Sequence, residues 1–115
     1  MSEYIPERIR SLARERAKGC CEYCLIHESD LIFSGQIDHI ISLKHFGKTE
    51  PDNLAYSCLI CNVNKGTDVA TYLHDEKEYV PFFNPRRHEW VDHFSYEKGW
   101  IIAKTKIGKA TASIF

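Results

Sequence analysis

The spacing of apolar residues in the first part of the chain predicts a helix. We place it over residues 6–18, where apolar positions recur every three to four residues and Gly19 follows as a helix-ending residue. These apolar positions are Ile5, Ile9, Leu12 and Ala13. The other face is rich in basic side chains, which suits either a solvated surface or contact with phosphate groups, and Arg14 is our candidate for such a contact.

Short apolar runs in the middle of the chain predict β-strands. They cover residues 31–33, 36–43 and 54–57, and a polar loop separates the second run from the third. Residues 61–65 then suit a short helix that Gly66 ends as a C-terminal cap.

The last third of the chain has the pattern of a hairpin. Apolar and aromatic runs over residues 90–96 and 100–105 flank Glu97-Lys98-Gly99, which is a typical turn sequence. Residues 68–79 are ambiguous, and the tail over 108–115 suits a short helix or strand. Because we find no repeats, low-complexity segments or linkers, we predict one small domain that mixes helices and strands.

The composition is that of an ordinary globular protein. The chain has 115 residues, of which 43% are hydrophobic and 27% charged, and this length leaves room for one domain. No apolar stretch approaches the roughly 18 residues that span a membrane, and the first ten residues are too charged for a signal peptide. We therefore expect a cytoplasmic protein.

The net charge of -1 argues only weakly against nucleic-acid binding, because the charges are unevenly distributed. Residues 1–19 hold five basic and three acidic side chains, and residues 86–109 hold six basic and three acidic ones. Acidic side chains gather instead over residues 22–38 and 68–78. A positive binding face is compatible with this distribution.

Four of the five cysteines predict a zinc site. Cys21 and Cys24 form one C-x2-C knuckle, Cys58 and Cys61 form a second, and 33 residues separate the two. Two such turns supply the four thiolates of a tetrahedral zinc centre, which would close a long loop. Cys20 is left over as a spare thiol.

Two other interpretations of the cysteines remain. Two disulfides, or a redox-active C-x2-C motif, would use the same residues. An odd number of cysteines fits a disulfide framework poorly, and nothing else in the chain indicates an oxidising compartment or a thioredoxin-like unit.

Candidate catalytic residues lie between and just after the knuckles. Asp38 and Asn62 offer hard oxygen ligands, which suit Mg²⁺ or Mn²⁺. His39 titrates in the range that allows it to take a proton from water near neutral pH. Lys65 lies three residues after Asn62 and would share its helix face, where a cation can hold a phosphate.

The order of these motifs resembles the HNH endonucleases, a family with a ββα-metal core. The residues that carry the resemblance are Cys21, Cys24, Asp38-His39-Ile40, Asn53-Leu54, Cys58, Cys61, Asn62 and Lys65-Gly66. Asn62 stands where the family's name has its final histidine, which is a common variant. Further similarity to a small bacterial subgroup extends the resemblance over roughly residues 17–111.

The resemblance implies an α+β fold. We expect a single HNH endonuclease domain over residues 1–115, with a ββα-metal core at about 17–70 closed by the four-cysteine zinc site. An N-terminal helix would precede the core, and a C-terminal extension at about 80–115 would carry the hairpin.

The resemblance also implies a role for each site residue. His39 would be the general base that activates water, and Asp38 and Asn62 would hold one catalytic divalent ion, Mg²⁺ or Mn²⁺. Asn53 would bind the loop backbone and keep His39 in place. The four cysteines of the knuckles would bind structural zinc. Products would carry 5′-phosphate and 3′-hydroxyl ends, and Lys65 and Arg86 are weaker candidates for phosphate contact.

The sequence leaves several alternatives open. A regular strand points adjacent residues to opposite faces, so Asp38 and His39 can share a site only if the strand bends at its end. The loop sequence Phe46-Gly47-Lys48 departs from the glycine pair that the family often has, which leaves the loop's path open. The expected partner is DNA, cut by a monomer or a homodimer. The runner-up is a zinc-containing nucleic-acid-binding module that does not cut.

Overall fold

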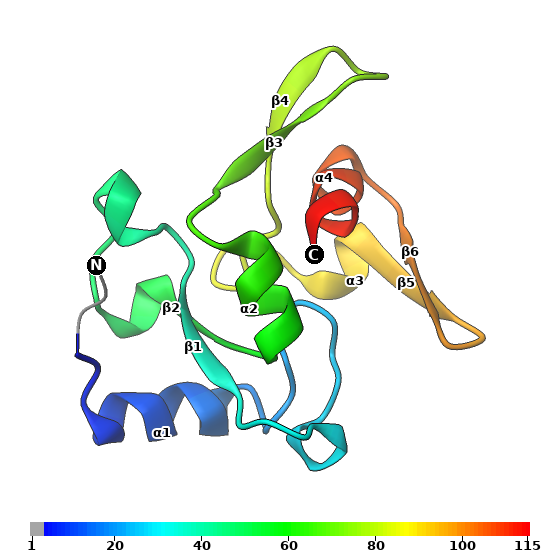
Figure 1. The fold of residues 1–115 in the computed structure, drawn as a ribbon. Coiled ribbons are helices and arrows are strands. Elements are labelled where there is room, and N and C mark those ends of the chain that lie inside the picture. The colour runs from blue at the N-terminus through cyan, green and yellow to red at the C-terminus, as the bar shows by residue number, and fades with distance from the viewer. Residues whose placement is uncertain (1–3) are drawn as a thin grey trace.

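The computed structural model describes residues 4–115 and begins with a helix followed by a ββα unit (Figure 1). Helix α1 spans Glu7–Arg16, and strands β1 (Gln36–His39) and β2 (Leu54–Ser57) pair antiparallel. Helix α2 (Leu59–Lys65) follows β2 directly and lies beside β1, while α1 contacts β2. The predicted ββα arrangement is therefore present.

The rest of the chain forms two further hairpins and two helices. The strands are β3 (Ala70–Leu73), β4 (Glu78–Pro81), β5 (Phe94–Glu97) and β6 (Trp100–Ala103). A short helix α3 (Trp90–His93) precedes β5, and α4 (Lys106–Ile114) follows β6 and packs against β3, β4 and β6. Single 3₁₀ turns cover Glu28–Asp30, Leu43–His45 and Pro51–Asn53.

Helix α1 is tied to the start of β2 by hydrogen bonds as well as by packing. The Arg16 guanidinium donates to the carbonyl oxygens of Pro51 at 3.0 Å and Leu54 at 2.8 Å. Ala13 is the buried residue of the helix, whereas Leu12, which the apolar spacing places on the same face, is 47% exposed.

The β1–β2 hairpin places its two strands in different environments. His39 pairs with Leu54 and Gln36 with Ser57. All four residues of β2 are buried, whereas β1 is only partly buried. As a result, β1 is the strand that borders the surface at the candidate site.

One hydrophobic core joins the ββα unit to the C-terminal part. Cys21, Cys61 and Ile40 from the first part pack in the same buried cluster as Phe83 and Phe94 from the second. A second cluster joins α4 to the β3–β4 hairpin. The chain is therefore a small, compact α+β domain, as predicted.

Three sequence-based predictions were wrong in detail. Residues 31–33 form no strand, because Ile32 is 95% and Phe33 63% exposed and neither has a strand partner. The strand predicted over 36–43 ends at His39, where the chain bends into the Leu43–His45 turn. The apolar run at 90–96 opens with helix α3 instead of continuing as a strand.

The ambiguous segment 68–79 is resolved as β3 and the start of β4. The predicted hairpin turn at 97–99 is present, with Lys98 and Gly99 both at positive φ. Within residues 4–115, no helix has the length and apolar character needed to cross a membrane.

Candidate metal centre and active site

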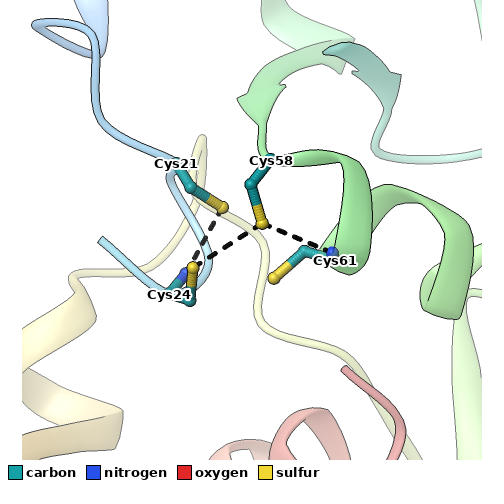
Figure 2. A group of neighbouring side chains, drawn as sticks. All are labelled: Cys21, Cys24, Cys58 and Cys61. Carbon is teal, nitrogen blue, oxygen red and sulfur yellow. Dashed lines mark hydrogen bonds between the residues drawn. The ribbon is translucent and has the colours of Figure 1, made fainter. Parts of the chain in front are cut away.

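The four cysteines of the two knuckles come together at one point. Cys21 and Cys24 lie on the turn after α1, while Cys58 is the N-cap of α2 and Cys61 lies in its first turn (Figure 2). Their four sulfur atoms all lie within 4.8 Å of one another, and the Cys24 and Cys58 sulfurs are 3.8 Å apart. Cys20 is not part of this cluster and lies half-buried beside it in sequence.

The geometry of this cluster fits zinc. Zn–S bonds of about 2.3 Å in a tetrahedron place the sulfur atoms about 3.8 Å apart. In each knuckle the backbone amide of the second cysteine donates to the sulfur of the first, at 3.5 Å for Cys24 to Cys21 and 3.4 Å for Cys61 to Cys58. These amides stabilise negative charge on the sulfurs, as thiolate ligands require.

Three of the four thiols affect one another's protonation. Hydrogen bonding to Cys24 and Cys61 lowers the pKa of Cys21. The contact with Cys21 raises the pKa of Cys24 to about 12 and raises that of Cys61 as well. Cys21, Cys24 and Cys61 can ionise together only if a cation offsets their mutual repulsion.

A groove of about 400 Å³ lies between β1, the 3₁₀ turn after it and α2. Asp38, His39 and Asn62 all border this groove. Asp38 and His39 both border it, although they are adjacent residues of β1; the strand ends at His39 and the chain bends immediately after it. The structure thus brings the three predicted catalytic residues to one concave surface.

Asn53 binds the loop that follows β1. Its side-chain oxygen accepts from the amide of Ile41, and its side-chain nitrogen donates to the carbonyls of Ile41 and Lys48, all at 2.9 Å. The same loop carries Thr49, whose hydroxyl oxygen lies 2.8 Å from Nε2 of His39. Asn53 is thus a buried brace of the loop that contacts His39.

Asp38 is more buried than an open metal ligand would be. It is 5% exposed; its Oδ1 accepts from Nζ of Lys65 at 3.1 Å and its Oδ2 from the hydroxyl of Tyr23 at 2.6 Å. Burial raises the pKa of Asp38, while Lys65 and Tyr23 oppose this rise. Each carboxylate oxygen has two acceptor sites, so a cation in the groove can still use the lone pairs that these partners leave.

The segment that holds these residues matches a known family. Residues 21–68 match the HNH endonuclease family, from Cys21 of the first knuckle to just past Lys65. The match contains both knuckles, Asn53 and the residues around the groove. No curated protein matches the chain.

The HNH match and the four-cysteine cluster together indicate a function that involves nucleic acid. They also support the interpretation of the knuckles as a structural zinc site. HNH domains act on nucleic acids. The C-terminal hairpins and α4 lie outside the matched residues, although they share the core of the HNH segment.

The basic residues predicted to contact phosphate all have partners within the protein. Lys65 is 2% exposed and pairs with Asp38. Arg86 is largely buried in an ion pair with Glu22. Phosphate contact by either residue would require these pairs to open, so this prediction gains no support from their placement.

Arg14 is the accessible member of the predicted phosphate contacts. Its guanidinium lies on the exposed face of α1 and pairs with Glu28 at 2.6 Å. Glu28 is only 22% exposed and binds this guanidinium through three hydrogen bonds of 2.6–2.9 Å, so a backbone phosphate would have to compete with a bidentate ion pair.

Two functional contacts were beyond sequence reasoning. Glu22 accepts from the amide of Tyr56 as well as from Arg86, and so links the first knuckle to β2 and to the C-terminal part. Tyr23 reaches Asp38 from within the same knuckle. Neither residue type has a spacing that signals a contact over 15 or more positions, so no pattern in the sequence pointed to them.

Proposed function

We propose that this protein is a divalent-metal-dependent DNA endonuclease that hydrolyses phosphodiester bonds. The observation that carries the proposal is the groove within the HNH segment, which Asp38, His39 and Asn62 border together. An acid, an imidazole and an amide oxygen at one concave surface suit metal-assisted hydrolysis.

His39 is the proposed general base. It would take a proton from the attacking water, a task that suits the ordinary titration range of imidazole. The contact between its Nε2 and Thr49 fixes the ring on one side, and Asn53 braces the loop that carries Thr49. Histidine and loop would thus be held in position before substrate binds.

Asp38 and Asn62 are the proposed ligands of one catalytic ion, Mg²⁺ or Mn²⁺. Both offer oxygen atoms at the groove, and hard cations of this kind prefer oxygen. When bound, the ion would neutralise charge that develops at the phosphate and stabilise the leaving 3′-oxygen. The four cysteines would hold zinc in a structural role, since none of them borders this groove.

A second candidate is a nucleic-acid-binding module that does not cut. One observation favours it: both carboxylate oxygens of Asp38 already accept hydrogen bonds from Lys65 and Tyr23. An aspartate used only inside the fold would leave the groove with too few ligands for a catalytic ion. The nuclease remains our proposal, because pure binding gives no reason to group His39 and Asn62 with Asp38 at one groove.

Cleavage of supercoiled plasmid tests the proposal. Purified protein loaded with zinc is incubated with Mg²⁺ or Mn²⁺, and nicked and linear products are compared with a control that receives neither ion. We expect metal-dependent nicking that Asn62→Ala abolishes and that Asn64→Ala preserves, since Asn64 is an exposed neighbour on the same helix. Absence of cleavage by the folded protein on varied plasmids would favour the binding module.

A further inference from the structure

A buried set of polar contacts connects the cysteine knuckles to the end of β1. The Tyr23 hydroxyl donates to Oδ2 of Asp38 at 2.6 Å. Nζ of Lys65 donates to Oδ1 of the same carboxylate at 3.1 Å and to the backbone carbonyl of His39 at 2.9 Å. All three side chains are at most 5% exposed, which is unusual for a lysine and an aspartate.

Each knuckle supplies one member of this set. Tyr23 lies between Cys21 and Cys24, so the first knuckle fixes its backbone. Lys65 lies one helical turn after Cys61 on α2, so the second knuckle fixes the helix that carries it. Asp38 is thus held at both oxygens by residues that the metal centre positions.

The surroundings leave Tyr23 little freedom to move. Its ring packs against Phe115 with 4.9 Å between centroids, and its carbonyl accepts from Nε1 of Trp90 at 3.0 Å. The hydrogen bond to Asp38 therefore has a rigid donor.

A buried ion pair of this kind contributes little to stability in net terms, because the cost of removing both charges from water offsets their attraction. The pair matters more for the position of the strand than for stability. Lys65 joins the carboxylate of Asp38 to the backbone of the next residue, and so fixes the strand at the point where it bends. Asp38 and His39 lie directly before that bend and border one groove.

We propose that Tyr23 and Lys65 are positioning residues that transmit the geometry of the four-cysteine centre to Asp38 and His39. The inference rests on the proposed nuclease function, in that it assigns a catalytic purpose to a buried contact set. It predicts that the Tyr23 hydroxyl can be removed without loss of zinc or fold, and that the orientation of the His39 imidazole changes when it is removed.

The test uses Tyr23→Phe, which keeps the ring against Phe115 and deletes the hydroxyl alone. Tyr79→Phe is the matched control, because Tyr79 is 78% exposed. Zinc content and melting temperature are measured first. The imidazole resonances of His39, assigned with His39→Gln, are then recorded by NMR without catalytic metal, and kcat and KM for nicking are determined.

We expect Tyr23→Phe to retain zinc and fold, to shift the His39 resonances and to lower kcat about tenfold at unchanged KM, because small displacements of catalytic groups carry large rate costs. The control variant should match the wild type in every measurement. Lys65→Met, which keeps the length of the stem, should shift the same resonances further. If either variant unfolds, the His39 resonances of the other variant test the inference.

Unshifted His39 resonances in a folded, zinc-loaded variant would overturn the inference. Loss of zinc or fold in both variants would overturn it as well, because the contacts would then be structural requirements. A raised KM at constant kcat would contradict a positioning role. If the wild type does not cut DNA at all, the proposed function fails by itself, and the NMR comparison still decides whether the contact set orients His39.

Discussion

The side chain of Asn53 forms two hydrogen bonds with the backbone of Ile41. Its oxygen accepts from the Ile41 amide and its nitrogen donates to the Ile41 carbonyl, both at 2.9 Å. The two residues are 12 positions apart, and the pair closes the loop between β1 and β2 at its base. The loop's position beside His39 therefore depends on one buried amide.

Replacement of Asn53 by alanine should destabilise the protein by about 1–3 kcal/mol, because it leaves backbone groups of Ile41 and Lys48 without their partner. Asn53→Asp keeps the oxygen that accepts from the Ile41 amide, but it cannot donate to the carbonyls of Ile41 and Lys48. Denaturant unfolding measures both variants, and a free energy of unfolding equal to wild type for Asn53→Ala would contradict the assigned role.

Gly47 should not tolerate a side chain. A Cβ at this position would lie 1.7 Å from the carbonyl oxygen of Ile41, a backbone atom that cannot move away alone. We expect Gly47→Ala to cost about 1–3 kcal/mol and to displace the loop. Gly99→Ala is the comparison. A Cβ there meets no atom within 4 Å, so the stability of this variant reports only the strain of the positive φ. Equal unfolding free energies for the two variants would refute the steric account.

The four-cysteine centre should hold one zinc ion per chain. Elemental analysis of purified protein should give this ratio, and Cys58→Ser should lower it sharply because three ligands remain. Cys20→Ser should keep the wild-type ratio, since Cys20 lies outside the cluster. Removal of zinc by a chelator should lower the melting temperature, because metal binding contributes to folding. A metal-free protein that melts at the same temperature would exclude a structural zinc site.

His88 should make stability depend on pH below neutrality. Burial and the neighbouring charge of His93 lower the pKa of His88 below its ordinary value of 6.5, and its Nδ1 accepts from the amide of Asn84 at 3.0 Å. A group with a lowered folded pKa contributes stability that is present above the unfolded value. That stability is lost as pH falls through the folded pKa.

The expected result is a decline in the free energy of unfolding below about pH 6.5 that is shallower in His88→Gln. The difference between the two proteins is the relevant quantity, because protonation of zinc-binding thiolates adds an acid dependence to both. Parallel pH profiles for the two proteins would show that His88 carries no such linkage.

The sequence predicted the features that rest on local spacing. Two C-x2-C turns require only that four residues meet, and the helix over α1 and the hairpin around Gly99 follow from periodicity and turn residues. The prediction of a strand at 31–33 was wrong because it too rested on local composition alone. Ile32 and Phe33 have strand-like composition, but no neighbouring segment pairs with them and both side chains are exposed.

The contacts of charged residues were not predictable from local pattern. Lysine is ordinarily a surface residue, so nothing in the sequence indicates that Lys65 is buried against a carboxylate 27 positions away. Arg86 likewise finds Glu22 over 64 positions, which changes a predicted phosphate contact into a link within the fold. Such pairs depend on tertiary placement, which spacing alone does not encode.

The most direct test of the account compares DNA cleavage and DNA binding in His39→Ala. Supercoiled plasmid with Mg²⁺ or Mn²⁺ reports nicking, and an electrophoretic shift without added Mg²⁺ or Mn²⁺ reports binding by the same zinc-loaded preparation. We expect the variant to bind DNA as the wild type does and to lose the ability to cut it. Wild-type cleavage by His39→Ala would contradict the role of His39 as the general base, and with it the proposed mechanism.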